Sequence, residues 1–201
     1  MQKRAFAPFI IAGPAHWANS WGALRQDPDG TTRRHLGQDV FCDYGAPVLA
    51  AEAGTVEFSS DPLGGLVARL HREEGGYFYY AHLSDWNDDR FSSGDRVSVG
   101  DVIGYCGISG NAYGGSPHVH FGYYAGGARD PMGFLLTWHE QAERRAGRIL
   151  RRLVGSADLT RLAHRFGEDL IPDLVVDPAL EMPYESVEAL LEAVVGSRNE
   201  I

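Results

Sequence analysis

Lysine is nearly absent from this sequence of 201 residues: Lys3 is the only one, and the formal net charge is -9. Phosphate backbones are bound by clustered lysines and arginines, so nucleic acid is not an expected partner. No apolar run of roughly 18 residues is present, so no transmembrane helix is expected. The N-terminal stretch MQKRAFAPFIIAGPA faintly resembles a secretory signal, but its apolar part is short and interrupted by Pro8, so no convincing signal peptide is predicted.

Cysteine is also scarce, with only Cys42 and Cys106 present. Two cysteines cannot build a disulfide framework, and their spacing fits no CxxC pattern for zinc binding or redox chemistry. They can form one bridge or remain separate thiols. Both lie in apolar, strand-like contexts, DVFCDYG and VIGYCGISG, which favours two buried thiols.

Glycine divides the chain into two zones, because 19 of the 25 glycines lie between Gly30 and Gly133. Within this zone, short β-type runs alternate with turn residues, as in an antiparallel sheet. The predicted strands are 54–59, 65–71, 77–83, two short runs within 94–107, and 118–124. After Pro131 the apolar spacing changes to about 3.6 residues, which predicts helices over 134–154, 157–171 and 184–196. The fold class is therefore a mainly β core with a C-terminal α-helical extension.

Four histidines and one aspartate stand out by their spacing. His35 and Asp39 lie four residues apart in HLGQD, and His118 and His120 lie two apart in HVHFG, so each pair shares a face of an extended chain. His82 ends an aromatic run. A catalytic zinc ion needs three protein ligands and an open position, which His35, Asp39 and one histidine of the HVH pair would supply. Taken alone, each pair has a simpler explanation. His118 and His120 could be a chance pair, and His35 with Asp39 could be an ion pair on the surface of a strand.

Several segments together resemble a known family, the lysostaphin-like or LytM-type zinc metallopeptidases, which cut the peptide part of peptidoglycan. HLGQD matches the HxGxD motif of that family, YYAHLS its YxHLS motif, and SPHVHFG its PHxHF motif. The linking runs GAPVLAAEAGTVEFS and VSVGDVIGYCGISGNAYGGSPH are similar to its linkers. The resemblance covers about residues 9 to 132. It departs from the family at Val119, where leucine is common, and at Gly122, where an acidic residue often stands.

The resemblance implies antiparallel sheets that form an open groove, as in LytM and other duplicated-hybrid-motif folds. It implies a metallopeptidase domain over residues 1–133, with a motif core at 33–132, followed by the extension at 134–201. Carried over by motif, His35, Asp39 and His120 would ligate one zinc ion per chain. His82 and His118 would then be the catalytic histidines.

The function implied is hydrolysis of peptide bonds in peptidoglycan cross-links or stem peptides, by attack of a zinc-bound water assisted by the two histidines. The loops 84–95 and 107–117 would wall a substrate cleft, with Trp86, Asn111 and Tyr113 as candidate substrate contacts. Such a function places the protein outside the cytoplasm, at the cell envelope.

Two alternatives stay open. A catalytically silent LytM-type module would bind the cell wall or activate another hydrolase, but such modules characteristically lack a metal ligand. A phosphocarrier resembling the glucose-permease IIA domain would use two histidines and would not require Asp39. The sequence indicates neither the cleaved bond nor the oligomeric state.

Overall fold

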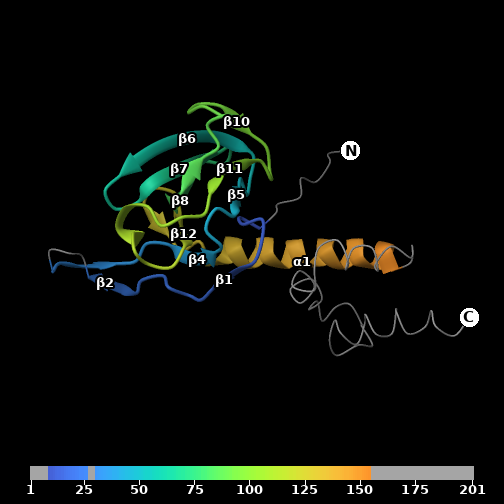
Figure 1. Cartoon of the computed structure of the whole chain (residues 1–201), viewed down its shortest axis with the longest axis horizontal. Helices are drawn as coiled ribbons and strands as arrows, with labels where there is room; N and C mark the ends of the chain where they lie inside the picture. The colour runs from blue at the N-terminus through green and yellow to red at the C-terminus, as the bar shows by residue number, and fades with distance from the viewer. Residues whose placement is uncertain (1–8, 27–29, 155–201) are drawn as a thin grey trace, which may run out of the picture. The chain divides into compact units, whose positions relative to one another are not determined.

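The computed structural model of the chain describes residues 9–26 and 30–154. Its strands form three antiparallel sheets, and the largest has the order β1-β4-β12-β8-β7-β6-β10, with β13 paired to β12. Figure 1 shows β6, β7, β8, β12 and β4 following one another across this curved sheet. The strands of the large sheet are β1 (Ala15–Trp17), β4 (Gln38–Cys42), β6 (Gly54–Asp61), β7 (Gly65–Arg72), β8 (Tyr77–Leu83), β10 (Arg96–Val97), β12 (His118–Tyr124) and β13 (Ala128–Arg129).

Two smaller sheets complete the β structure. One has the order β5-β11-β9, and the other is the hairpin β2-β3, which precedes β4 in the chain. Their elements, together with the single short 3-10 helix η1 of the described residues, are β2 (Leu24–Gln26), β3 (Thr32–Arg34), β5 (Pro47–Leu49), β9 (Asp85–Trp86), β11 (Val102–Tyr105) and η1 (Gly110–Ala112). The predicted mainly β, antiparallel core is confirmed.

The side chains of the large sheet alternate between a buried and a more open face, as the two-residue period of a strand requires. On β12, Val119 and Phe121 are fully buried, so that His118 and His120 lie on the opposite face. Strand β4 alternates in the same way, with Val40 buried and Asp39 on the histidine face. The apolar alternation of two neighbouring strands therefore directs polar side chains to one face.

Helix α1 (Met132–Val154) begins immediately after Pro131, two residues earlier than predicted. The carboxylate of Asp130 accepts a hydrogen bond from the backbone N–H of Met132 at 2.9 Å, and proline is favoured in the first turn, so the start is capped. Leu135 and Trp138 are buried, and the Trp138 ring lies 5.2 Å from that of Phe78. The first turns of α1 thus complete the core beneath the large sheet.

The chain divides into two compact units, residues 1–139 and 140–201. The predicted boundary between residues 133 and 134 stays a prediction. The helices predicted over 157–171 and 184–196 lie outside the described residues. In the part of the chain that the structure describes, no helix is both long and apolar enough to cross a membrane.

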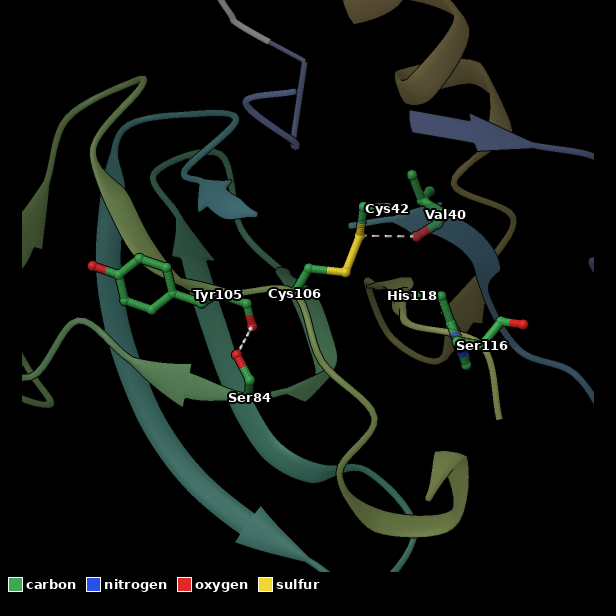
Figure 2. The surroundings of a disulfide bond; sticks show 7 residues. All are labelled: Val40, Cys42, Ser84, Tyr105, Cys106, Ser116 and His118. Atoms are coloured by element: carbon green, nitrogen blue, oxygen red, sulfur yellow. Dashed lines mark hydrogen bonds between the residues drawn. A yellow bond between two sulfur atoms is a disulfide. The ribbon is translucent and has the colours of Figure 1, made fainter. Parts of the chain in front are cut away.

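Cys42 and Cys106 form a disulfide bond, with their Cα atoms 6.5 Å apart (Figure 2). The interpretation of these cysteines as two buried thiols is therefore wrong. Their strand-like contexts were identified correctly, since Cys42 ends β4 and Cys106 follows β11, but the sequence carried no sign that these two elements lie side by side. The bridge joins the strand of Asp39 to the residue that precedes the loop 107–117.

Candidate metal centre

The pairing of β4 with β12 builds the centre of the candidate site. The strands are antiparallel, and their register places His120 directly opposite Asp39 and His118 opposite Phe41. Directly opposed residues of an antiparallel pair project from the same face, close enough for their side chains to interact. His35 lies just before β4, in the turn between β3 and β4 rather than in a strand, and reaches the same point.

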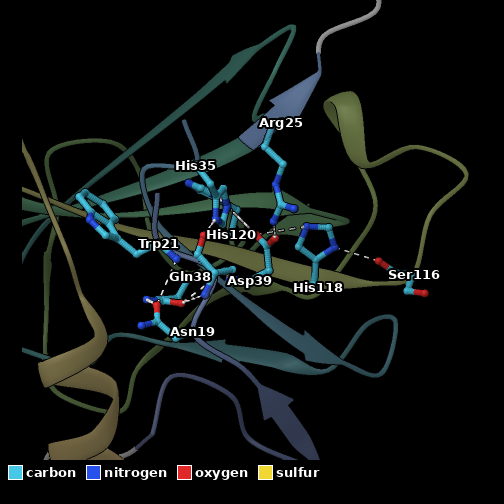
Figure 3. A network of polar contacts seen from close by, with 10 residues as sticks. Asn19, Trp21, Arg25, His35, Gln38, Asp39, Ser116, His118 and His120 are labelled. Atoms are coloured by element: carbon cyan, nitrogen blue, oxygen red, sulfur yellow. Dashed lines mark hydrogen bonds and ion pairs between the residues drawn. The ribbon is translucent and has the colours of Figure 1, made fainter. Parts of the chain in front are cut away.

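Three side-chain atoms converge there (Figure 3). His35 Nε2 lies 2.7 Å from His120 Nδ1 and 3.0 Å from Asp39 Oδ1, and His120 Nδ1 lies 3.3 Å from the same oxygen. His35 Nδ1 lies 2.9 Å from the carbonyl oxygen of Ser20, to which it can only donate, so its Nε2 presents a lone pair. Two imidazole nitrogens and one carboxylate oxygen are a donor set that suits zinc with a fourth position open.

The electrostatics of the cluster keep these donors in the form that binds a metal. Burial raises the pKa of Asp39, but hydrogen bonds and charge interactions with His120 and His35 outweigh it and hold that pKa well below its usual range. Burial lowers the pKa of His120, and the nearby Asp39 offsets only part of this effect. A carboxylate and a neutral imidazole result at neutral pH, and metal ligands must be deprotonated in this way.

Gly37 makes room for the His120 ring. A Cβ atom at this position would lie 2.6 Å from His120 Nε2 and 2.6 Å from the carbonyl oxygen of Phe121, closer than packed atoms approach. Its backbone φ is not in the left-handed region, so the requirement is one of space. The glycine of HLGQD is therefore needed for His120 to reach the cluster.

His82 and His118 lie beside the three converging side chains. Their ring centroids are 4.9 Å apart, and His118 Nε2 lies 3.8 Å from Asp39 Oδ1. In each ring Nδ1 lies 2.9 Å from a backbone carbonyl oxygen, that of Ser109 for His82 and that of Ser116 for His118. Because a carbonyl only accepts, each Nδ1 carries the proton and each Nε2 is free to accept one.

His82 has an unusual backbone, with φ at 65°, and is the only non-glycine residue of the described chain in the left-handed region. The register of β7 with β8 shifts at this point, between the pairs Leu66–Leu83 and Ala68–Tyr80, which leaves one extra residue on β8. Such bulges redirect side chains and often lie beside active sites. Burial lowers the pKa of His82 to about 4, with a further lowering by His118.

The three candidate substrate contacts differ in their surroundings. Tyr113 is 84% exposed, next to η1, and Asn111 within η1 is also exposed. Trp86 is half-buried: its Nε1–H donates to the carbonyl oxygen of Val67 at 3.1 Å, and its ring stacks on Phe58. Tyr113 and Asn111 are therefore accessible side chains, whereas Trp86 is anchored to the core.

Sequence reasoning missed Ser20 and Arg25, which contact the cluster from the segment before β3. The hydroxyl of Ser20 accepts a hydrogen bond from the backbone N–H of Asp39 at 3.2 Å, and Arg25 Nη2 lies 2.6 Å from Asp39 Oδ2. Neither residue belongs to a motif. The pairing of β1 with β4 brings Ser20, which follows β1, to the cluster, and the hairpin β2-β3 brings Arg25.

Comparison with known proteins identifies the same region. The profile described as peptidase family M23 matches residues 33–131. The L-Ala--D-Glu endopeptidase of Bacillus subtilis (strain 168) is 32% identical over 142 residues, a match that covers 65% of this chain and 43% of that protein. The chain thus spans less than half the length of this relative.

Several solved structures share the fold. The catalytic domain of the antimicrobial peptidase lysostaphin from Staphylococcus simulans is 30% identical with a TM-score of 0.51, covering 60% of this chain and 91% of that domain. A zinc-containing peptidase from Vibrio cholerae is 25% identical with a TM-score of 0.54, covering 64% of this chain and 40% of that one. All five residues of the predicted zinc and catalytic sets lie within the region that the family profile matches.

Proposed function

Because the chain belongs to peptidase family M23 through its residues 33–131, we propose that it is a zinc-dependent endopeptidase that hydrolyses peptide bonds in peptidoglycan cross-links or stem peptides. The observation that carries this proposal is the convergence of His35 Nε2, His120 Nδ1 and Asp39 Oδ1, which all lie within 3.3 Å of one another. The zinc-containing peptidase neighbour and the endopeptidase relative support the same reading.

In this proposal His35, Asp39 and His120 hold one zinc ion per chain. When bound, zinc would polarise the scissile carbonyl group and lower the pKa of a water molecule in its open position. The three side chains contribute one negative charge in total, so the loaded centre keeps a net positive charge. The fully buried strand residues behind them limit their movement and thereby preserve the geometry.

His82 and His118 would move the protons of hydrolysis. Each offers Nε2 as an acceptor, because each Nδ1 donates to a backbone carbonyl oxygen. Peptide hydrolysis requires removal of one proton from the attacking water and delivery of one to the leaving amine. Since no glutamate stands in the three motifs, the two imidazoles beside the metal ligands are the groups available for both transfers.

The substrate would lie along the loops 84–95 and 107–117, with the exposed side chains of Asn111 and Tyr113 in contact and with Trp86 supporting the first loop. A stem peptide is a short extended chain, and strand-like backbone hydrogen bonds suit its recognition. The disulfide Cys42–Cys106 supports a location outside the reducing cytoplasm, where a peptidoglycan hydrolase works.

The test is digestion of purified peptidoglycan with detection of newly formed amino groups, followed by mass spectrometry of the released fragments. We expect amine release that stops with a chelator and returns with added zinc. Asp39→Ala should be inactive, whereas Asp43→Ala, which changes an exposed aspartate just after β4, should match the wild type. Zinc binding without amine release would contradict the proposal and favour a silent binding or activating module.

A further inference from the structure

The two oxygens of the Asp39 carboxylate have different partners. Oδ1 faces the histidines, at 3.0 Å from His35 Nε2 and 3.3 Å from His120 Nδ1. Oδ2 points away from them and lies 2.6 Å from Nη2 of Arg25 (Figure 3). We propose, on the basis of the proposed zinc function, that Arg25 is a positioning residue that holds Oδ2, so that Asp39 offers the metal Oδ1 alone.

The physical reason is that a carboxylate has two modes of metal binding. It can bind a metal ion through one oxygen or through both, and binding through both would occupy an additional position. A guanidinium N–H bonded to Oδ2 makes a strong, charge-assisted hydrogen bond that competes with the metal for that oxygen. With Oδ2 engaged, His35, Asp39 and His120 supply three donor atoms, and the fourth position of a tetrahedral zinc ion stays open.

The hairpin that carries Arg25 is also bonded to His35. The backbone N–H of His35 donates to the carbonyl oxygen of Ala23 at 2.8 Å, and the N–H of Gly22 donates to the carbonyl oxygen of His35 at 2.8 Å. Arg25 lies two residues beyond Ala23, within β2. A single element therefore sets the backbone of one ligand and the carboxylate of another.

Arg25 lies before the region that the family profile matches, which begins at residue 33. This contribution is thus not contained in the three motifs. A plain surface ion pair is the rival explanation, since the Arg25 side chain is 38% exposed and exposed pairs contribute little to stability. The rival predicts that removing Arg25 leaves metal binding unchanged, whereas a positioning role predicts a change at the metal itself.

The test compares wild type, Arg25→Ala and Arg25→Lys, each stripped with a chelator and titrated with zinc against a competing chromophoric chelator. We expect Arg25→Ala to weaken zinc binding 10- to 100-fold, the usual cost of losing a group that orients a metal ligand. Arg25→Lys should stay within about 10-fold of wild type, because one ammonium N–H can still bond Oδ2. Arg25→Met, which keeps the length of the side chain but has no N–H to bond Oδ2, replaces the alanine variant if that variant fails to fold.

A second readout reports denticity directly. Cobalt(II) in the same centre absorbs visible light more weakly as its coordination number rises, so Arg25→Ala should lower the band intensity by freeing Oδ2 for the metal. Arg90→Ala is the matched control, because Arg90 Nη2 pairs with Asp101 Oδ1 at 2.9 Å away from the cluster. Its zinc affinity and cobalt spectrum should equal those of the wild type.

The outcomes separate this inference from the proposed function. Wild-type zinc binding and cobalt bands that persist unchanged in Arg25→Ala would overturn the role of Arg25 and leave the peptidase proposal standing. A wild-type protein that binds no zinc would overturn both. A wild-type protein that binds zinc but cleaves no peptidoglycan, while Arg25→Ala shows the expected loss of affinity, would support the inference and contradict the peptidase proposal.

Discussion

Nδ1 of His82 lies 2.9 Å from the carbonyl oxygen of Ser109, at the one described non-glycine residue with a left-handed backbone. This contact fixes both the orientation of the imidazole and the nitrogen that carries its proton. The bulge in β8 turns the ring toward His118, whose centroid is 4.9 Å away. The left-handed backbone of His82 and the register shift in β8 thus place a neutral imidazole beside the candidate ligands, with its Nε2 available to accept a proton.

The first prediction concerns proton transfer by His82. In His82→Asn, asparagine tolerates the positive φ and its amide can still donate to Ser109, but no group can accept a proton there. We expect zinc content to stay at the wild-type level and kcat to fall by about 10²- to 10⁴-fold, the usual contribution of general acid–base catalysis. Elemental analysis and amine release from peptidoglycan measure the two quantities.

His118→Ala tests whether the second histidine also acts in proton transfer and not in metal binding. The variant should also retain zinc and lose turnover, because only His35, Asp39 and His120 are proposed as ligands. A metal-free His118→Ala protein would assign His118 to the metal and contradict the proposed roles.

The second prediction concerns pH and stability of the metal-free chain. His82 has a pKa near 6.5 when unfolded and about 4 when folded, because it is buried. Between these values the unfolded state binds more protons, so the free energy of unfolding rises with pH. The stability is complete above the unfolded pKa and is lost as pH falls toward 4.

Urea unfolding of wild type and His82→Asn between pH 4 and 7, with chelator present, measures this effect. Other histidines are common to both proteins, so the difference between them reports His82. The wild type should lose about 2 to 3 kcal/mol more than the variant on going from pH 6.5 to pH 4. Parallel pH profiles for the two proteins would show that His82 does not titrate in this range.

The third prediction concerns the space that Gly37 leaves for His120. In Gly37→Ala the new methyl group would lie 2.6 Å from His120 Nε2, so the ring must shift away from Asp39 and His35. We expect at least a 10-fold loss of zinc affinity. Gly133→Ala is the control, since no atom lies within 4 Å of its added Cβ and alanine favours the helix. Equal zinc affinities in the two variants would refute this account of Gly37.

The fourth prediction concerns the bridge between Cys42 and Cys106, which closes a loop with a sequence separation of 64. Chain-entropy arguments assign about 4 kcal/mol of stability to a loop of this length. The double variant Cys42→Ala/Cys106→Ala should therefore unfold at a lower denaturant concentration, and its free energy of unfolding should be lower by about 4 kcal/mol. Equal unfolding curves for the oxidised wild type and the double variant would argue against the bridge.

Local pattern predicted the strands that matter most. The runs 77–83 and 118–124 coincide with β8 and β12: the first is rich in aromatic residues, which favour strands, and in the second buried Val119 and Phe121 alternate with the two histidines. The resemblance to the family likewise predicted that His35, Asp39 and His120 would meet, and their side chains do converge. His35, however, lies in a turn before β4 and reaches Asp39 across it, whereas a common strand face was expected.

The remainder of the site depends on contacts between distant segments. Arg25 meets Asp39 only because the hairpin β2-β3 folds back beside β4, and two isolated cysteines carry no sign of their pairing. The left-handed backbone of His82 arises from a shift in strand register, which no residue type at that position announces. Periodicity and motifs describe one segment at a time, whereas each of these three features depends on how two distant segments pack or pair.

The most direct test of the central claim is anomalous diffraction at the zinc edge from crystals of the protein loaded with one equivalent of zinc. We predict a single peak within about 2.0 to 2.2 Å of His35 Nε2, His120 Nδ1 and Asp39 Oδ1, with Asp39 Oδ2 still bonded to Arg25. No peak among these side chains, or a peak held by other residues, would contradict the account.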